Sequence, residues 1–146
     1  TSSEKTELFD ISKLLNHSIM KYENKNITSN IEQKVFFNGR RSLINRCMDN
    51  LINNSLKYSN KVLVNLKKIH KNLIITVDDD GPGIAESEYE NVFKPFYKIN
   101  KGRGDSKSSV GLGLSISSDV VRSHGGSITL EKSSLGGLKV KISLPS

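Results

Sequence analysis

The stretch that decides the fold is Leu73–Ile84, with the sequence LIITVDDDGPGI. Its first part, Leu73–Val77, alternates apolar and polar residues, and period-two alternation predicts a β-strand. The three acids and two glycines that follow predict a turn at the end of this strand. Gly81 and Gly83 would leave room for a ligand close to the backbone, with one carboxylate directed into the gap. A plain Asp-Gly turn is the alternative interpretation.

The segments on either side predict a mixed order of helices and strands without internal repeats. Val62–Leu66 also alternates, and a His-Lys-Asn turn joins it to Leu73–Val77, which predicts an antiparallel hairpin. The other predicted elements are a helix over 11–22 capped by Asp10, strands near Ile27–Ile31 and Val35–Phe37, a helix over Arg40–Tyr58, a short helix near Glu86–Phe93, a helix over Leu112–Ser123, and a hairpin of Ser127–Glu131 with Leu138–Leu144. In the first helix, the residues expected to face inward are Ile11, Leu14, Leu15, Ile19 and Met20.

Composition restricts the class of protein further. The length of 146 residues suits one domain with a real core. The single cysteine, Cys47, excludes a disulfide-stapled secreted domain and favours a reducing, cytosolic compartment. No apolar run approaches the roughly 18 residues of a membrane span, so the chain itself is not expected to insert in a membrane. The net charge of +7 suits phosphate-rich partners, but the basic residues are scattered without aromatic stacking runs, so nucleic acid is not the expected partner.

The predicted helix over Arg40–Tyr58 places two amides and one ammonium in a row. At about 100° per residue, Asn54 lies about 40° and Lys57 about −20° from Asn50. The residues expected to face the core, about 100–200° away, are Ile44, Met48, Leu51, Ile52 and Ser55. An amide oxygen suits Mg²⁺, which also binds substrate phosphates, and a lysine provides a point charge for those phosphates. The row could hold a metal-triphosphate, and a solvated helix face is the alternative.

A third feature is Gly111–Ile116, in which two glycines precede a predicted helix. Free amides at a helix N-terminus favour an anion, although the segment is neither a Walker loop nor a dinucleotide fingerprint.

Within the acidic turn, a carboxylate can accept a hydrogen bond from an exocyclic amine but not from a carbonyl, so it would select adenine over guanine. All three features in this order are more specific than any one of them.

Together these features resemble the catalytic ATP-binding domain of sensor histidine kinases, which has the Bergerat-type fold shared with the Hsp90, gyrase and mismatch-repair ATPases. The matching segments are Asn50–Ser59 for the N box, Asp79–Ile84 for the first glycine box, Val92–Lys98 for the phenylalanine box and Gly111–Ile116 for the second glycine box. Gly104–Ser106, taken with Asp79–Ala85, is similar to the osmosensor kinases. The resemblance covers the whole chain and implies one catalytic ATP-binding domain over residues 1–146, an α+β two-layer sandwich with a mixed, mainly antiparallel sheet of about five strands on about three helices.

The resemblance also implies roles for individual residues. Asn54 would ligate Mg²⁺ and, with Lys57, would be catalytic, while Asp79 would accept from the adenine amine. The residues implied to bind the nucleotide are Asn50, Asn54, Lys57, Tyr58, Asp79, Gly81, Gly83, Ile84, Tyr97, Lys98, Arg103, Gly111, Leu112, Gly113 and Leu114. The span over 98–110 would form a mobile lid. Phe93 and Phe96 would dock the lid or a neighbouring helical domain, and core packing is an equal alternative for Phe93.

Two departures bear on the chemistry. Ser109 stands where the family usually has a lid glycine, which puts lid flexibility and phosphate contact there in question. Hydrolysing members of the superfamily resemble one another in having a glutamate base four residues before the metal asparagine, and Asn50 stands at that position. An amide cannot take a proton, so hydrolysis is disfavoured as the main activity.

The implied activity is that of a protein-histidine kinase with ATP and Mg²⁺ as cofactors. The γ-phosphate would pass to a histidine on a separate dimerisation domain of the same homodimeric protein, and then to a response regulator. His17, His70 and His124 match no phosphoacceptor box and are expected to be structural or solvated. The chain should therefore bind ATP without phosphorylating itself. Its expected place is the cytoplasmic side of the inner membrane, in a longer membrane protein. A gyrase- or Hsp90-like ATPase and a silent nucleotide-binding module stay open as alternatives.

Overall fold

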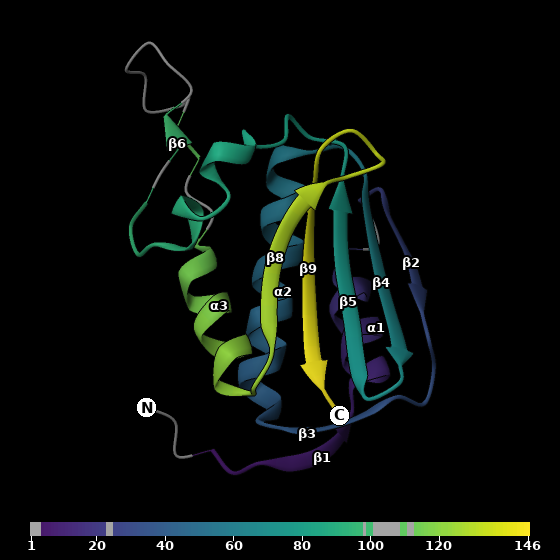
Figure 1. The fold of residues 1–146 in the computed structure, drawn as a ribbon. Coiled ribbons are helices and arrows are strands. Elements are labelled where there is room, and N and C mark those ends of the chain that lie inside the picture. Colours follow the sequence, from purple (N-terminus) through teal and green to yellow (C-terminus); the bar gives the residue numbers. More distant parts are fainter. Residues whose placement is uncertain (1–3, 23–24, 98, 101–108, 111–112) are drawn as a thin grey trace.

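The computed structural model describes residues 4–22, 25–97, 99–100, 109–110 and 113–146. A five-stranded sheet in the order β2-β4-β5-β9-β8 lies in front of three helices that cover one of its faces (Figure 1). The main elements are β1 (Glu7–Asp10), α1 (Ile11–Met20), β2 (Ile27–Ile31), β3 (Phe36–Gly39), α2 (Arg41–Tyr58), β4 (Val62–Ile69), β5 (Asn72–Asp79), α3 (Leu114–Ser123), β8 (Ser127–Lys132) and β9 (Leu138–Pro145). This architecture confirms the predicted two-layer α+β sandwich.

The sheet is mixed because its first pair differs from the others. β2 pairs with β4 in parallel, whereas β4–β5, β5–β9 and β9–β8 are antiparallel. Both predicted hairpins are therefore confirmed, with strands a few residues longer than expected. The sequence did not predict β1, which pairs with β3 in a separate ribbon, or the short pair β6 (Ile99–Asn100) and β7 (Ser109–Val110).

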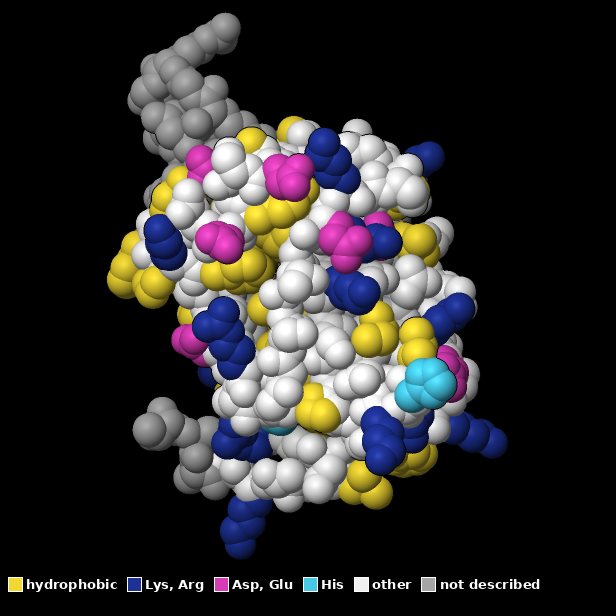
Figure 2. Space-filling model, in the orientation of Figure 1, with side chains coloured by type: hydrophobic (Ala, Val, Ile, Leu, Met, Phe, Trp, Pro, Cys, Tyr) yellow, Lys and Arg dark blue, Asp and Glu magenta, His cyan; other side chains and the backbone are white. Residues whose placement is uncertain are grey.

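The core lies between the sheet and the helices. Six alternating residues of β4 and β5 form its centre, and none is more than 1% exposed: Val62, Val64, Leu66, Leu73, Ile75 and Val77. Burying a side chain of this kind stabilises the fold by about 1.5–3 kcal/mol. On the opposite face of the sheet, lysine and acidic side chains are interspersed (Figure 2). In the part of the chain that the structure describes, no helix combines the length and apolar character needed to cross a membrane.

The first helix begins as predicted but buries fewer residues. The Asp10 carboxylate accepts a hydrogen bond from the Lys13 backbone N–H at 3.0 Å, as a side chain capping a helix N-terminus does. The prediction that Met20 faces inward is wrong, because its side chain is 68% exposed. At about 100° per residue, Met20 lies about 180° from Ile11, on the opposite side of the helix.

The segment between β5 and α3 also differs from the prediction. The short helix expected near Glu86–Phe93 is two separate 3₁₀ turns, η1 (Glu86–Glu88) and η2 (Asn91–Phe93). Short apolar-poor segments rarely repay the cost of nucleating an α-helix. The third helix begins at Leu114, two residues after the predicted start.

Candidate functional site

The polar row of α2 lies on the side of the helix that the core leaves uncovered. Asn50 and Asn54 are partly exposed and Lys57 is exposed, whereas the opposite side packs into the core. The predicted core-facing residues are all buried, at 6% exposure or less: Ile44, Met48, Leu51, Ile52 and Ser55. The predicted wheel of this helix is therefore confirmed. The carboxyl ends of α2 and β5 lie at the same end of the molecule (Figure 1).

Asn50 connects α2 to the start of α3. Its side-chain N–H₂ donates to the Gly113 carbonyl oxygen at 3.3 Å and to the Ser117 hydroxyl at 3.2 Å. Gly113 is the N-cap residue of α3 and has a φ of 61°, a backbone conformation that favours glycine. Asn50 therefore helps to set the position of the second glycine box relative to the polar row.

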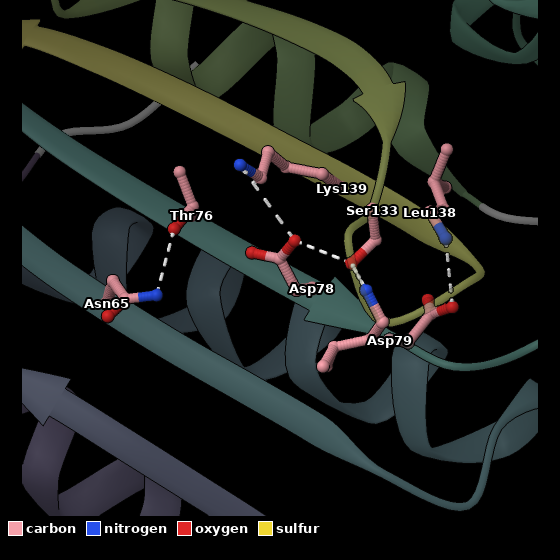
Figure 3. Close-up of polar contacts among 8 residues, drawn as sticks. Asn65, Thr76, Asp78, Asp79, Ser133, Leu138 and Lys139 are labelled. Carbon is pink, nitrogen blue, oxygen red and sulfur yellow. Dashed lines mark hydrogen bonds and ion pairs between the residues drawn. The ribbon is translucent and has the colours of Figure 1, made fainter.

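Asp79 is the last residue of β5 and is buried, at 7% exposure. One oxygen, Oδ1, accepts a hydrogen bond from the backbone N–H of Leu138 at 3.0 Å (Figure 3). The same oxygen accepts a second one from the backbone N–H of Gly81 at 2.9 Å. Among the described residues, no hydrogen bond is formed to the other oxygen, Oδ2. Burial raises the pKa of Asp79, because the charged form loses water, and the two N–H donors oppose this effect.

The next two residues join the acidic turn to the end of α2. Asp80 Oδ1 accepts from the backbone N–H groups of Asn60 at 2.9 Å and Lys61 at 2.8 Å. These hydrogen bonds, the one from Lys61 first, lower the pKa of Asp80. At Gly81 a Cβ atom would lie 2.6 Å from the Tyr58 carbonyl oxygen. Gly81 is therefore required by the protein's own backbone, and the ligand approach suggested by the sequence stays a prediction.

An open cavity of about 530 Å³ lies beside this junction. Its lining consists of Lys57, Tyr58, Ser59, Asn60, Asp80, Gly81 and Pro82. The Lys57 ammonium lies 5.8 Å from the centre of the Tyr58 ring, so the cation and the aromatic face are close. The structure thus brings together three of the predicted nucleotide residues, Lys57, Tyr58 and Gly81, on one surface.

The connection between β8 and β9 completes the surroundings of the acids. Ser133 donates its hydroxyl hydrogen to Asp78 Oδ2 at 2.7 Å, and the Lys139 ammonium lies 4.0 Å from the same oxygen. The Gly137 N–H donates to the Asp79 carbonyl at 3.0 Å. Ser133 and Gly137 are not predicted as site residues from the sequence, because adjacent glycines in a hairpin predict only a turn. The available signal was that Gly136-Gly137 contains one glycine more than such a turn requires.

The remaining predicted positions have mixed surroundings. Gly83 has a φ of 71°, Ile84 packs partly against the core, and Leu114 is buried at 2% exposure. The Tyr97 hydroxyl donates a hydrogen bond to Glu88, which raises the pKa of Tyr97. The predicted positions that lie outside the described residues are Lys98, Arg103, Gly111 and Leu112, together with Gly104–Ser106.

A comparison with protein families identifies this arrangement. The family described as "Histidine kinase-, DNA gyrase B-, and HSP90-like ATPase" matches residues 39–146. The chain belongs to this family. Within it, sensor histidine kinase GtrS of Pseudomonas aeruginosa is 35% identical and sensor histidine kinase CpxA of Escherichia coli is 36% identical, each over 108 residues or 73% of this chain. The chain spans 22% and 24% of the length of these two relatives.

Solved structures agree on the fold of this ATPase-family domain. The nucleotide-free catalytic domain of histidine kinase ThkA superposes with a TM-score of 0.83 at 22% identity, covering 97% of this chain and 95% of that one. ThkA in complex with response regulator protein TrrA superposes with a TM-score of 0.80 at 20% identity, covering 96% and 41% of the two chains. The family match and the two kinase relatives, together with this fold, make the domain an ATP-binding domain of the sensor histidine kinase type.

The two phenylalanines of the phenylalanine box, Phe93 and Phe96, have different surroundings. Phe93 is partly buried and packs against the core, which favours the core-packing interpretation for this residue. Phe96 is 100% exposed and has a φ of 61°. An unburied phenylalanine ring is available for a partner surface, and its docking role stays a prediction.

The histidines of the domain are placed as structural or solvated groups. His17 and His70 are exposed and lie on α1 and in the β4–β5 turn. His124 Nε2 accepts from the Arg40 backbone N–H at 3.0 Å, and its Nδ1 lies 2.8 Å from the Val120 carbonyl oxygen. Its ring also packs against Phe37. His124 therefore holds the end of α3 against the start of α2.

Proposed function

We propose that this domain binds ATP with Mg²⁺ and presents the γ-phosphate to a histidine on a separate dimerisation domain of the same protein. The phosphoryl group would then pass to a response regulator. The observation that carries the proposal is the buried Asp79, with one carboxylate oxygen held by two N–H donors, at the same end of the molecule as the partly exposed amide and lysine row of α2. Membership in the family supports nucleotide binding.

Asp79 is the proposed acceptor for the adenine base. Because Oδ1 is occupied by Gly81 and Leu138, Oδ2 is the atom offered to a ligand. Oδ2 of the ionised carboxylate can accept from the 6-amino group of adenine but not from the 6-carbonyl of guanine. The cavity beside Tyr58 and Gly81 offers an aromatic and backbone surface to the ligand.

Asn54 and Lys57 are the proposed contacts for Mg²⁺ and the phosphates. Within the described ranges there is no group of three or more His, Cys, Asp or Glu side chains that could hold a metal. A neutral amide oxygen fits Mg²⁺ that is held largely by phosphates and water, and this donor set matches Asn54. Bound Mg²⁺ would neutralise charge on the phosphates. Lys57 adds a cation on the same helix face, and Lys98 and Arg103 are proposed to extend this set from the lid.

Asn50 stands at the position where hydrolysing members of the superfamily have a glutamate base. Asn50 uses its N–H₂ group to hold Gly113 and Ser117, and an amide does not accept a proton from water. Positioning and charge neutralisation are then the contributions of this chain to phosphoryl transfer. The acceptor histidine is proposed to come from elsewhere, because none of the three histidines present matches a phosphoacceptor box.

The proposed partners follow from the same assignment. The ThkA complex with TrrA supports a response regulator as the final acceptor, and the exposed Phe96 supports docking of a neighbouring helical domain. We place the domain on the cytoplasmic side of the inner membrane within a homodimeric sensor. The osmosensor subtype stays a hypothesis based on Gly104–Ser106 taken with Asp79–Ala85.

Incubation with γ-labelled ATP and Mg²⁺ tests the proposal. The 146-residue chain should bind ATP, acquire no stable label and release phosphate slowly. The longer protein that contains it should acquire an acid-labile label, as phosphohistidine does, and Asn54→Ala should abolish that label. Stable labelling of the isolated chain, or rapid release of phosphate by it, would contradict the proposal. ATP binding without any transfer in the longer protein would instead indicate a silent nucleotide-binding module.

A further inference from the structure

The segment Ser133–Gly137, which joins β8 to β9, folds over the carboxyl end of β5 (Figure 3). Two backbone hydrogen bonds close it: Ser133 N–H donates to the Gly137 carbonyl at 2.9 Å, and Gly136 N–H donates to the Ser133 carbonyl at 3.0 Å. We call this segment the β8–β9 loop. Its two ends contact two successive aspartates of β5.

The first end is anchored on the outer face of the sheet. Successive residues of a strand point to opposite faces, so Asp78 and Asp79 lie on opposite sides of β5. Asp78 is 3% exposed and accepts from the Ser133 hydroxyl, which also accepts from the Leu135 N–H at 3.0 Å. Asp78 also pairs across the strands with Lys139. Ser133 is thus the buried attachment point of the loop.

The second end of the loop holds Asp79. The Gly137 N–H donates to the Asp79 carbonyl oxygen, and the following N–H, of Leu138, donates to Asp79 Oδ1. A Cβ atom at Gly137 would lie 2.1 Å from Asp79 Oδ1 and 2.6 Å from the Gly81 nitrogen. Any side chain at this position would therefore displace the carboxylate or break its hydrogen bond to Gly81.

We propose that the β8–β9 loop is a positioning element for recognition of a 6-aminopurine, with Gly137 and Ser133 as its positioning residues. Gly137 holds the Asp79 backbone carbonyl and places the next residue, Leu138, so that its N–H reaches Asp79 Oδ1. Holding Oδ1 in this way sets the direction in which Oδ2 is presented to the base. Neither residue needs to touch the nucleotide. The inference rests on the proposed function, since it requires Asp79 to be the base acceptor.

The test compares ATP with purine riboside triphosphate, an analogue that lacks the 6-amino group, by calorimetric titration of the 146-residue chain with Mg²⁺. The unaltered chain should prefer ATP by about tenfold, the size of one good hydrogen bond to a charged group. Gly137→Ala should abolish this preference, so that the two ligands bind with about equal affinity, because the carboxylate is displaced. Affinity for the analogue should change by less than about twofold, because its phosphate contacts remain.

Serine variants keep the test independent of folding at Gly137. Ser133→Ala removes the hydroxyl that holds Asp78 and should reduce the preference about threefold, whereas Ser133→Thr keeps a hydroxyl and should restore it. The matched control is Ser134→Ala, at an exposed position of the same loop. A purely structural role would weaken both ligands equally and leave the preference at tenfold.

The outcomes separate the inference from the proposed function. An unchanged preference in Gly137→Ala and Ser133→Ala, with the preference lost in Asp79→Asn, would overturn the role of the loop and leave Asp79 as the base acceptor. No preference in the unaltered chain, or a preference that survives Asp79→Asn, would overturn the proposed function as well.

Discussion

The two halves of the candidate site are built in different ways. The row on α2, with Asn50, Asn54 and Lys57, lies on one helix and is partly open to solvent. The base half depends on Asp79, which is buried and held by N–H groups from two separate segments. Solvated groups can rearrange at little cost in free energy. A buried acceptor has a fixed direction, and leaving it without a hydrogen-bond donor costs much more binding free energy. We therefore expect substitutions in the base half to have larger effects than those in the phosphate half.

The largest effect is expected for Asp79→Asn. The asparagine would offer its oxygen to the N–H groups of Gly81 and Leu138 and would turn its N–H₂ group toward the base, where the adenine amine also donates. Calorimetry should show ATP affinity reduced by about 100-fold, or roughly 2.8 kcal/mol. Thermal unfolding without nucleotide controls for loss of the fold. A reduction smaller than fivefold in a folded variant would show that Asp79 does not recognise the base.

Asn54→Ala tests the metal half and should have a smaller effect. ATP affinity should fall by about tenfold with Mg²⁺ present and by less than about twofold with a chelator, because only the metal-dependent part is lost. Asn53→Ala, an exposed amide on the same helix, is the matched control and should bind like the unaltered chain. Equal losses with and without Mg²⁺ would refute the assignment of Asn54 as the metal ligand.

Lys57→Ala should have an effect of only about threefold, because the ammonium is exposed and acts through a screened charge. This loss of affinity should shrink as salt is raised from about 0.05 to about 0.5 M, because exposed charges more than a few ångströms apart are then largely screened. Lys61→Ala removes an equivalent exposed charge near the same cavity and should change affinity less. A loss that does not depend on salt would indicate a packing role for Lys57.

The smallest expected effects are opposite pH dependences of stability at two neighbouring acids. Burial raises the pKa of Asp79 above its ordinary value of 3.8, so the folded state binds more protons and stability falls as the pH rises from 3.8 to the raised pKa. Hydrogen bonds lower the pKa of Asp80, so its contribution is present above 3.8 and is lost as the pH falls through the lowered pKa. Urea unfolding of Asp79→Asn and Asp80→Asn between pH 2 and 7 should each remove one of these slopes. Slopes of the same sign would contradict the assigned environments.

The same contrast explains how much the sequence could predict. The row on α2 could be predicted because one helix has a fixed angular period, and the apolar stripe from Ile44 to Ile52 defines which side is buried. The alternating strands and both hairpins followed from period two in the same way. The prediction for Met20 was wrong although the helical period itself holds, because a wheel drawn to the end of α1 places Met20 about 180° from Ile11.

Contacts between distant segments could not be predicted from the sequence. The contacts of Ser133 with Asp78 and of Gly137 with Asp79 depend on the register of β5 with β9, which pairs Asp78 with Lys139. No local pattern encodes this register. The requirement for Gly81 likewise arises from the Tyr58 carbonyl, more than twenty residues earlier in the chain. The residue types at these positions were visible in the sequence, but the reason for them was not.

A titration of the unaltered 146-residue chain with ATP and with GTP, each with Mg²⁺, tests the central claim most directly. The carboxylate of Asp79 can accept from the 6-amino group of adenine, whereas the 6-carbonyl of guanine would face it acceptor to acceptor. ATP should saturate the chain with one site, and GTP should bind about 100-fold more weakly. Equal affinities for the two nucleotides, or no binding of ATP, would contradict the claim that this domain holds ATP through Asp79.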